Sequence, residues 1–215
     1  MPGRLRWGAA AAVAGYAALQ ALGRTMGSTA VERRSGFPGD EVIRDPNAVT
    51  NHAVTIAAPP EAIWPWLTQM GWHRGGWYTP RWVDAVFFPA NWPSLDRLDP
   101  RFTRDLVAGD MIPDGPPGTA WYEVHAVRTP HTLVLHSVTH VPQAWRRYGA
   151  RIDWTWAFRL TRLPGGRTRL QVRVRGQAEP WWLAAAYVLV LIPADAIMAT
   201  GMLRGIRKRA ETRRA

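Results

Sequence analysis

Strict alternation of apolar and polar residues is the clearest pattern in this chain, and it falls in two neighbouring stretches. In residues 151–163, one face carries Ile152, Trp154, Trp156, Phe158 and Leu160. The opposite face carries Arg151, Asp153, Thr155 and Arg159. A Pro-Gly-Gly turn follows at 164–166, and residues 167–176 repeat the pattern with Leu170, Val172 and Val174 opposite Arg169, Arg173 and Arg175. This two-residue period predicts an antiparallel hairpin with one apolar face covered and one charged face in solvent.

Weaker alternation predicts further strands at 52–57, 119–127 and 132–138, and a short one after residue 106. In the first of these, His52, Val54 and Ile56 share one face. We therefore expect about six or seven strands.

A helix is predicted directly after the strand at 52–57. Pro59 and Pro60 end the strand, and a proline in the first turn of a helix removes only an amide that would be unpaired. The spacing of Ile63, Trp64, Leu67 and Met70 then gives one apolar stripe before Gly71. Gly75 and Gly76 allow a tight turn before the aromatic pair Trp77 and Tyr78.

This unit, with IAAPPEAIWPWLTQMG followed by RGGWY, resembles the opening of the SRPBCC proteins (START and polyketide-cyclase-like, or helix-grip), and more narrowly an uncharacterised bacterial subgroup. PGDEVI at 38–43 and MLRGIRKRAE at 202–211 resemble other segments of that subgroup. The resemblance implies an α+β fold in which a curved antiparallel sheet of six to seven strands wraps around a long C-terminal helix. The helix-grip domain would span 51–211, after an apolar helix and lead-in at 1–50 and before a basic tail at 212–215.

Two apolar segments raise the question of membrane contact. Residues 7–22 contain no charge and follow Arg4 and Arg6, which is typical of a signal peptide or N-terminal anchor, although a surface helix fits equally well. Residues 181–203 are long enough to span a membrane and contain one charge, Asp195. Because an aspartate is costly at mid-membrane depth, we prefer a break at Pro193.

The break at Pro193 gives two helices with different roles. Residues 181–192 would form an interfacial or lid helix, and residues 193–211 an amphipathic closing helix. Its inward positions would be Ala194, Ile197, Met198, Met202 and Ile206.

The composition adds a strong positive charge. The formal net charge is +11, and Lys208 is the one lysine among 27 basic residues. The arginines are spread along the chain without a nucleic-acid-binding motif, so an anionic membrane surface is the expected partner rather than nucleic acid. We expect a membrane-associated or cytoplasmic protein. The chain has no cysteine, which excludes disulfides and thiolate chemistry.

No motif predicts a cofactor or a metal. The six histidines include His136 and His140, but their spacing does not bring them together on a strand, and no HExxH motif occurs. Candidate acid or base groups are Asp84, Glu123, His136 and Asp153, none of which the pattern places in an interior. We therefore assign no catalytic residue.

The fold implied by the resemblance leaves an apolar cavity between sheet and helix. The side chains expected to bind a ligand there are Tyr122, Trp154, Trp156 and Phe158 from the sheet, Met198 and Met202 from the helix, and Trp77 and Tyr78 at the entrance. Aromatic and methionine side chains suit a hydrophobic small molecule or lipid, held non-covalently by a carrier or sensor at a membrane. The alternative is a polyketide aromatase/cyclase-like enzyme, which would need at least two titratable groups converging in the cavity.

Overall fold

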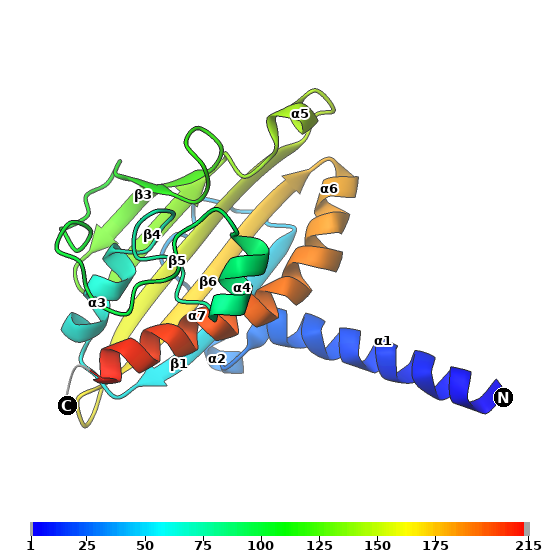
Figure 1. The fold of residues 1–215 in the computed structure, drawn as a ribbon, viewed down its shortest axis with the longest axis horizontal. Helices are drawn as coiled ribbons and strands as arrows, with labels where there is room; N and C mark the ends of the chain where they lie inside the picture. Colours follow the sequence, from blue (N-terminus) through cyan, green and yellow to red (C-terminus); the bar gives the residue numbers. More distant parts are fainter. Residues whose placement is uncertain (1, 213–215) are drawn as a thin grey trace.

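The computed structural model describes the backbone of residues 2–212 and the side chains of residues 7–86 and 88–212. The predicted basic tail lies outside these residues beyond Thr212, as do the side chains of Arg4 and Arg6. Six strands form one sheet (Figure 1). They are β1 (Ala48–Ile56), β2 (Met111–Pro113), β3 (Trp121–Arg128), β4 (Thr132–Ser137), β5 (Arg151–Leu163) and β6 (Arg167–Glu179).

The strands are antiparallel throughout, in the order β1-β6-β5-β4-β3-β2, so the first strand pairs with the last. The helices are α1 (Pro2–Thr25), α2 (Ala30–Arg34), α3 (Pro60–Thr68), α4 (Arg81–Phe87), α5 (Gln143–Arg146), α6 (Trp181–Ala186), the π-helical segment η1 (Tyr187–Leu191) and α7 (Ile192–Thr212). Figure 1 shows α7 crossing one face of the sheet, with α3 and α4 on that same face and α1 extending away from the body. This α+β arrangement confirms the predicted helix-grip architecture.

The apolar face of the β5–β6 hairpin lies under α7, as the alternation predicts. Trp156 pairs with Val174, Phe158 with Val172 and Leu160 with Leu170, which places all six side chains on one face. Phe158 and Leu170 are fully buried, and Leu203 and Ile206 of α7 pack in the same cluster. This cluster is the main core of the molecule.

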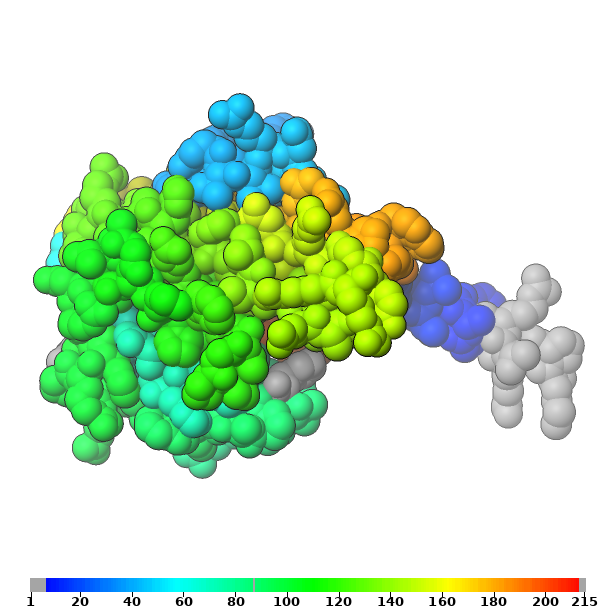
Figure 2. All heavy atoms as spheres, turned by 90° about the horizontal axis from the view of Figure 1, so that it is seen from above, coloured from blue at the N-terminus to red at the C-terminus, as the bar shows by residue number. Residues whose placement is uncertain are grey.

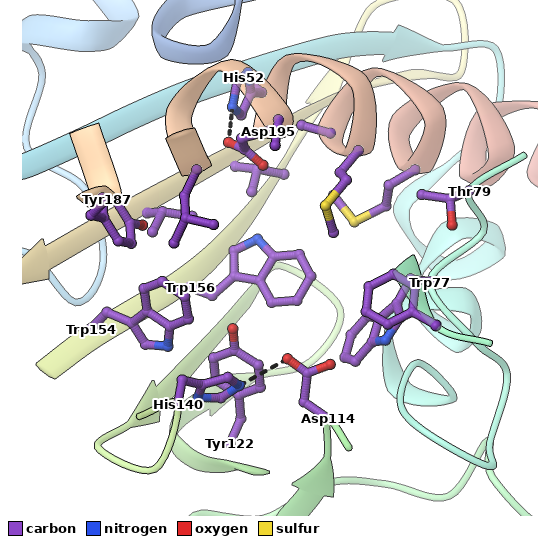
Figure 3. A pocket seen from close by; sticks show the side chains of 18 residues that line it. His52, Trp77, Thr79, Asp114, Tyr122, His140, Trp154, Trp156, Tyr187 and Asp195 are labelled. Atoms are coloured by element: carbon purple, nitrogen blue, oxygen red, sulfur yellow. Dashed lines mark hydrogen bonds and ion pairs between the residues drawn. The ribbon is translucent and has the colours of Figure 1, made fainter. Parts of the chain in front are cut away.

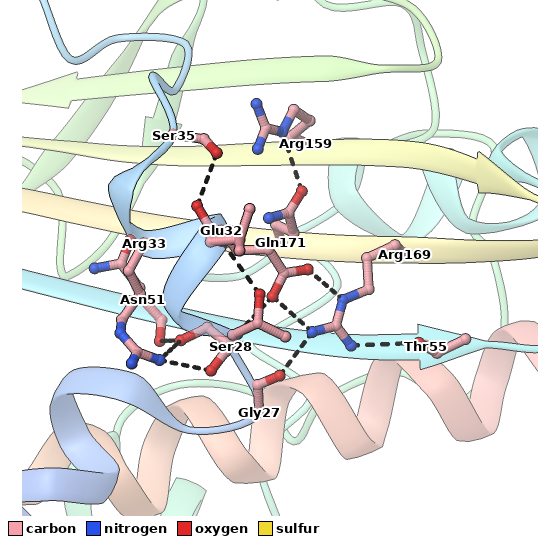
Figure 4. Close-up of polar contacts among 12 residues, drawn as sticks. Gly27, Ser28, Glu32, Arg33, Ser35, Asn51, Thr55, Arg159, Arg169 and Gln171 are labelled. Carbon is pink, nitrogen blue, oxygen red and sulfur yellow. Dashed lines mark hydrogen bonds and ion pairs between the residues drawn. The ribbon is translucent and has the colours of Figure 1, made fainter.

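Part of the opposite face of the sheet is covered rather than open to solvent, which corrects the prediction for Arg169 and Arg173. Residues 27–47 cross this face and form a ridge on one side of the body (Figure 2). Arg173 is only 4% exposed, because its guanidinium donates to the Asp40 carboxylate and to backbone carbonyls of this segment. Arg169 likewise donates to Glu32 and to the carbonyl of Gly27 (Figure 4). A guanidinium has five N–H donors, and hydrogen bonds to all of them offset the desolvation cost of its burial.

The contact with Arg169 also changes the acidity of Glu32. Hydrogen bonds from Arg169 are the main cause that lowers the pKa of Glu32 from 4.5 to about 2, against a smaller opposing effect of burial. Thr29 adds a capping box with Glu32 at the start of α2. The lead-in is therefore fixed to the sheet by charge-assisted hydrogen bonds.

The C-terminal helix does not break at Pro193, contrary to the prediction. Trp181–Thr212 is one helix of 32 residues, and η1 precedes the proline. Ile192 donates its amide to the carbonyl of Tyr187, five residues back, and Pro193 has no amide to donate. The proline is thus accommodated by a π-helical turn, and the ribbon changes direction there (Figure 1).

This π-helical turn leaves two carbonyls available, and α1 supplies their donors. The Tyr16 hydroxyl donates to the Leu189 carbonyl at 2.7 Å, and the Gln20 amide donates to the Val188 carbonyl at 2.8 Å. One turn further along α1, Gly23 lies so close to α7 that an added Cβ would be 1.9 Å from the Ile192 carbonyl oxygen. Helix α1 is therefore docked on η1 by its last three turns.

The long C-terminal helix has an exposed half and a packed half. Its most apolar 18-residue window is only 28% buried, and it is long and apolar enough to cross a membrane by length and composition. In α7, however, Ala196, Met202 and Ile206 are buried against the sheet. Ile197 is 37% exposed, which corrects its predicted inward position, because it lies on the side of α7 that turns away from the sheet.

Candidate ligand-binding cavity

A cavity of about 240 Å³ lies between the sheet and the first half of α7 (Figure 3). Its floor is formed by strands β1, β3, β5 and β6, its roof by η1 and α7, and its sides by the loops before α4 and after β2 and β4. The apolar lining consists of Trp77, Phe88, Tyr122, Trp154, Trp156, Val172, Val174, Tyr187, Leu191, Ala194, Met198, Ala199 and Met202. The polar lining consists of His52, Thr79, Asp114, His140 and Asp195.

Six tryptophan, tyrosine and phenylalanine rings line the cavity. Trp154 and Trp156 reach it because they occupy alternate positions on β5, directly under η1 and α7. Trp156 is the centre of this wall: its ring centroid lies 5.3 Å from that of Trp77 and 5.5 Å from that of Tyr122. The wall offers flat, polarizable surfaces that suit an aromatic or otherwise unsaturated ligand.

The first polar group of the cavity is an Asp–His pair held by two loops. The Nε2 atom of His140 lies 2.9 Å from Oδ2 of Asp114, and its Nδ1 atom lies 2.7 Å from the Ser137 hydroxyl (Figure 3). The Ser137 hydroxyl donates to the Trp121 carbonyl, so the Nδ1 atom of His140 is the donor to Ser137. Burial is the main cause that raises the pKa of Asp114, and the hydrogen bond with His140 opposes it. The pair can therefore hold a proton inside the cavity.

Tyr122 lies beside this pair. Its ring centroid is 4.7 Å from that of His140. Burial, with a further contribution from the charge of Asp114, raises the pKa of Tyr122 well above 10.0. The Tyr122 hydroxyl therefore stays protonated at neutral pH and acts as a hydrogen-bond donor.

A second Asp–His pair lies on the opposite wall, which Figure 3 shows across the Trp156 ring from the first. His52 of β1 and Asp195 of α7 are joined at 2.8 Å, and His52 is 1% exposed. Burial and the charge of Asp195 raise the pKa of Tyr187, whose side chain lines the same end of the cavity. The pair ties the helix to the first strand at the edge of the cavity.

The cavity lining contains no arginine or lysine. Two carboxylates belong to it, both paired with histidine. A ligand with a negatively charged head group would therefore find no arginine or lysine there, and both histidines already pair with a carboxylate, which argues against fatty acids as the bound species. Nor does the part of the chain that the structure describes contain three His, Cys, Asp or Glu side chains grouped to hold a metal ion.

Most of the side chains predicted to bind ligand lie in this cavity. Those that line it are Trp77, Tyr122, Trp154, Trp156, Met198 and Met202. Phe158 lies on the same face but further along β5, inside the solid core. Tyr78 is 1% exposed, and its hydroxyl donates to the Trp66 carbonyl instead of facing the cavity.

The predicted acid or base candidates lie elsewhere. His136 and Asp153 form a pair at 2.7 Å on the face of the sheet away from α7, where the Asp153 side chain is 49% exposed. Glu123 is exposed, and Asp84 accepts hydrogen bonds from Thr79 and Ser94 behind the cavity wall. Of these candidates none lines the cavity.

The sequence analysis predicts none of the histidines and carboxylates that line the cavity as site residues. His52 could have been found, because it alternates with Val54 and Ile56 on one face of its strand. Asp114 and His140 lie in loops without periodicity, so no pattern signals that they meet. In the sequence, Asp195 is only a charge that disfavours a membrane span.

A comparison with the solved structures found several similar chains. A hypothetical protein from Helicobacter pylori has a similar structure, with a TM-score of 0.50 and 11% identity over 80% of this chain and 94% of that one. The Zhui aromatase/cyclase from Streptomyces sp. R1128 matches with a TM-score of 0.43 and 14% identity over 78% and 96%. A conserved protein from Geobacillus kaustophilus matches with a TM-score of 0.44 and 12% identity over 77% and 96%.

Sequence comparison adds no further relative. No protein-family model matches the chain, and a search of curated proteins gave no match. At these identities the structural matches bear on fold alone. With its six-stranded antiparallel sheet and its closing C-terminal helix, the chain has a helix-grip fold.

Proposed function

We propose that this protein binds a compact, uncharged and largely aromatic molecule non-covalently in the cavity under α7. The observation that supports this function is the cavity itself, about 240 Å³ in volume and walled by tryptophan, tyrosine and methionine side chains. Ligand sites of this kind combine an apolar wall with a few oriented polar groups.

The size and chemistry of the cavity narrow the ligand. Its volume is below the range of about 300–1,000 Å³ that is usual for small-molecule sites, so a two-chain lipid does not fit inside. The indole N–H of Trp77 is buried and finds no acceptor among the side chains and backbone that the structure describes. A carbonyl or hydroxyl oxygen on the ligand would satisfy such a donor, and Tyr122 offers a second one.

The test is a binding titration with the fluorescent probe N-phenyl-1-naphthylamine. Ala194 lines the cavity, and Ala194→Leu adds three carbon atoms to the cavity roof. We expect this variant to bind the probe about tenfold more weakly than the wild type, because a filled cavity excludes the rings. The matched control is Ala186→Leu, which makes the same change at an exposed position of the same long helix. Equal affinities of all three proteins would contradict binding in this cavity.

A second candidate function is acid–base catalysis of the aromatase/cyclase kind. The observation that favours it is the convergence of Asp114, His140 and Tyr122 on one wall of the cavity. A buried carboxyl with a raised pKa, paired with a histidine, can give a proton to a ligand carbonyl and take one from the neighbouring carbon.

Mass spectrometry of the small molecules that co-purify with the protein separates the two functions. A binding protein and its His140→Gln variant would carry the same compound. An enzyme that dehydrates and aromatises its substrate would instead carry, in the variant, a compound heavier by one water. Identical masses would leave binding as the function.

A further inference from the structure

Exposed apolar side chains gather at one end of the molecule. Figures 1 and 2 both place α5, α6 and the base of α1 together there. On α1, Trp7 is 79% and Val13 is 70% exposed. On α6 and η1, Trp181 is 81% and Val190 is 61% exposed. We call residues 7–19 of α1 together with α5, α6 and η1 the apolar end.

Helix α1 is apolar on all sides where it leaves the body. Residues 7–19 are all exposed, and residues 7–22 contain no charge. Its contacts with η1 are made by Tyr16 and Gln20, so they use the polar side chains and leave the apolar ones outside. A helix without a polar face is buried against protein or lipid in its working state.

Helix α5 adds aromatic and basic residues to the apolar end. On and beside α5, Trp145 is 44% and Tyr148 is 61% exposed, and Arg146 and Arg147 are exposed with them. Trp145 packs edge-to-face on Trp182 of α6 at 5.8 Å, which joins α5 to the apolar end. Within the described residues no carboxylate forms an ion pair with either arginine. Tryptophan and tyrosine at an apolar boundary, with arginines at the same level, match the interface of an anionic bilayer.

Length and charge favour a bilayer over a second copy of the chain. At about 1.5 Å per residue, residues 7–19 extend roughly 20 Å, which is enough for one leaflet but not for a hydrocarbon core of about 30 Å. A symmetric dimer through this end would bring the α5 arginines of both copies, like charges, into one interface. We infer that the apolar end docks into one leaflet of an anionic membrane.

The docked orientation brings the cavity to the lipid. Leu191 belongs to both surfaces, because it lines the cavity and is 47% exposed on η1. The proposed ligand would then pass between membrane and cavity along η1. This last step rests on the proposed function, whereas the docking does not.

The test is flotation of the full chain with phosphatidylcholine vesicles that contain about one third phosphatidylglycerol. We expect the wild type to float, and Val13→Glu and Val190→Glu each to lower the partition coefficient at least about tenfold, since a carboxylate is costly in the apolar layer. Val107→Glu is the matched control: Val107 is 59% exposed, and it precedes β2, at the edge of the sheet opposite β1 and α1. It should float like the wild type.

A second pair of measurements tests the basic residues and the rival partner. Arg146→Gln with Arg147→Gln should lower binding about fivefold per charge on anionic vesicles and leave the weaker binding to pure phosphatidylcholine unchanged. Circular dichroism and probe binding check that each variant is folded. Wild-type protein that does not float, or variants that float equally well, would overturn the proposal. So would a dimer in solution that Val13→Glu dissociates, because a second copy would then cover this end.

Discussion

The two ends of the interface between α7 and the sheet are built from the same helix and the same strands, yet one is solid and the other hollow. At the solid end, Phe158 and Leu160 of β5 pack against Leu203 and Ile206 of α7. At the hollow end, Trp154 and Trp156 of β5 face Ala194, Met198 and Ala199 across the cavity. Two of the three helix side chains there are alanines, which are too short to fill the gap under the tryptophan rings.

This difference means that the residues of α7 that stabilise the fold and those that line the cavity lie at different ends of the helix. The solid end contacts α3 and holds the sheet and helix together. The hollow end is roofed by η1, which is supported from outside by α1. A variant at the solid end should therefore change the free energy of unfolding, and one at the hollow end should change the cavity.

The largest expected effect is that of Leu203→Ala. Leu203 is 1% exposed at the solid end, so this change should lower the free energy of unfolding by about 2–5 kcal/mol. Met198→Ala, one and a half turns earlier, should cost about 1 kcal/mol or less, because Met198 borders empty space and has fewer packing partners to lose. Urea unfolding measures the loss of free energy in both variants, provided that their m-values are equal. Equal losses would show that the two ends do not differ in packing.

The sequence predicts which residues face the helix, but not where along the helix the interface opens. Alternation places Trp156 and Phe158 on the same face, and the structure confirms this. It cannot tell that Trp156 borders a cavity while Phe158 is core, because that depends on where α7 and its π-helical turn cross the strand. The burial of Arg173 is not predictable for a similar reason: its partners lie more than 120 residues away in sequence.

The polar half of the site was the least predictable. Asp114 and His140 come from different loops, and their meeting is fixed by strand pairing between β2, β3 and β4. The strand pattern makes His136 and Asp153 candidates for an acid or base, because they lie on paired strands. The structure places both outside the cavity. Titratable groups on loops escape any method that depends on periodicity.

A smaller effect is expected from Gly23→Ala, which acts on the support of the hollow end. A Cβ at this position would meet the Ile192 carbonyl oxygen at 1.9 Å, so α1 has to move off η1, at a cost of about 1–3 kcal/mol. Gly15→Ala is the control: its Cβ meets nothing within 4 Å, and it should gain up to about 1 kcal/mol from helix propensity.

Hydrogen exchange locates the effect of Gly23→Ala. Faster exchange of the amides in η1, with unchanged exchange in α3, would show that α1 supports the hollow end alone. Faster exchange in both regions would mean that the two ends unfold together and that the separation proposed here is wrong.

The smallest expected effect concerns the buried charge at the hollow end and depends on pH. Burial raises the pKa of Asp114 above 3.8, so the folded protein holds this proton more tightly than the unfolded chain. The resulting stabilisation is complete below about pH 3.8 and is lost as the pH rises through the raised pKa. Asp114→Asn, which cannot ionise, should therefore gain stability relative to the wild type as the pH rises, by an amount on the order of 1 kcal/mol.

The matched control is Asp153→Asn, which alters an Asp–His pair of similar length on the exposed face and should change stability by less than about 0.5 kcal/mol at any pH. Parallel stability curves for the two variants would show that the cavity does not distinguish its carboxylate from one in solvent.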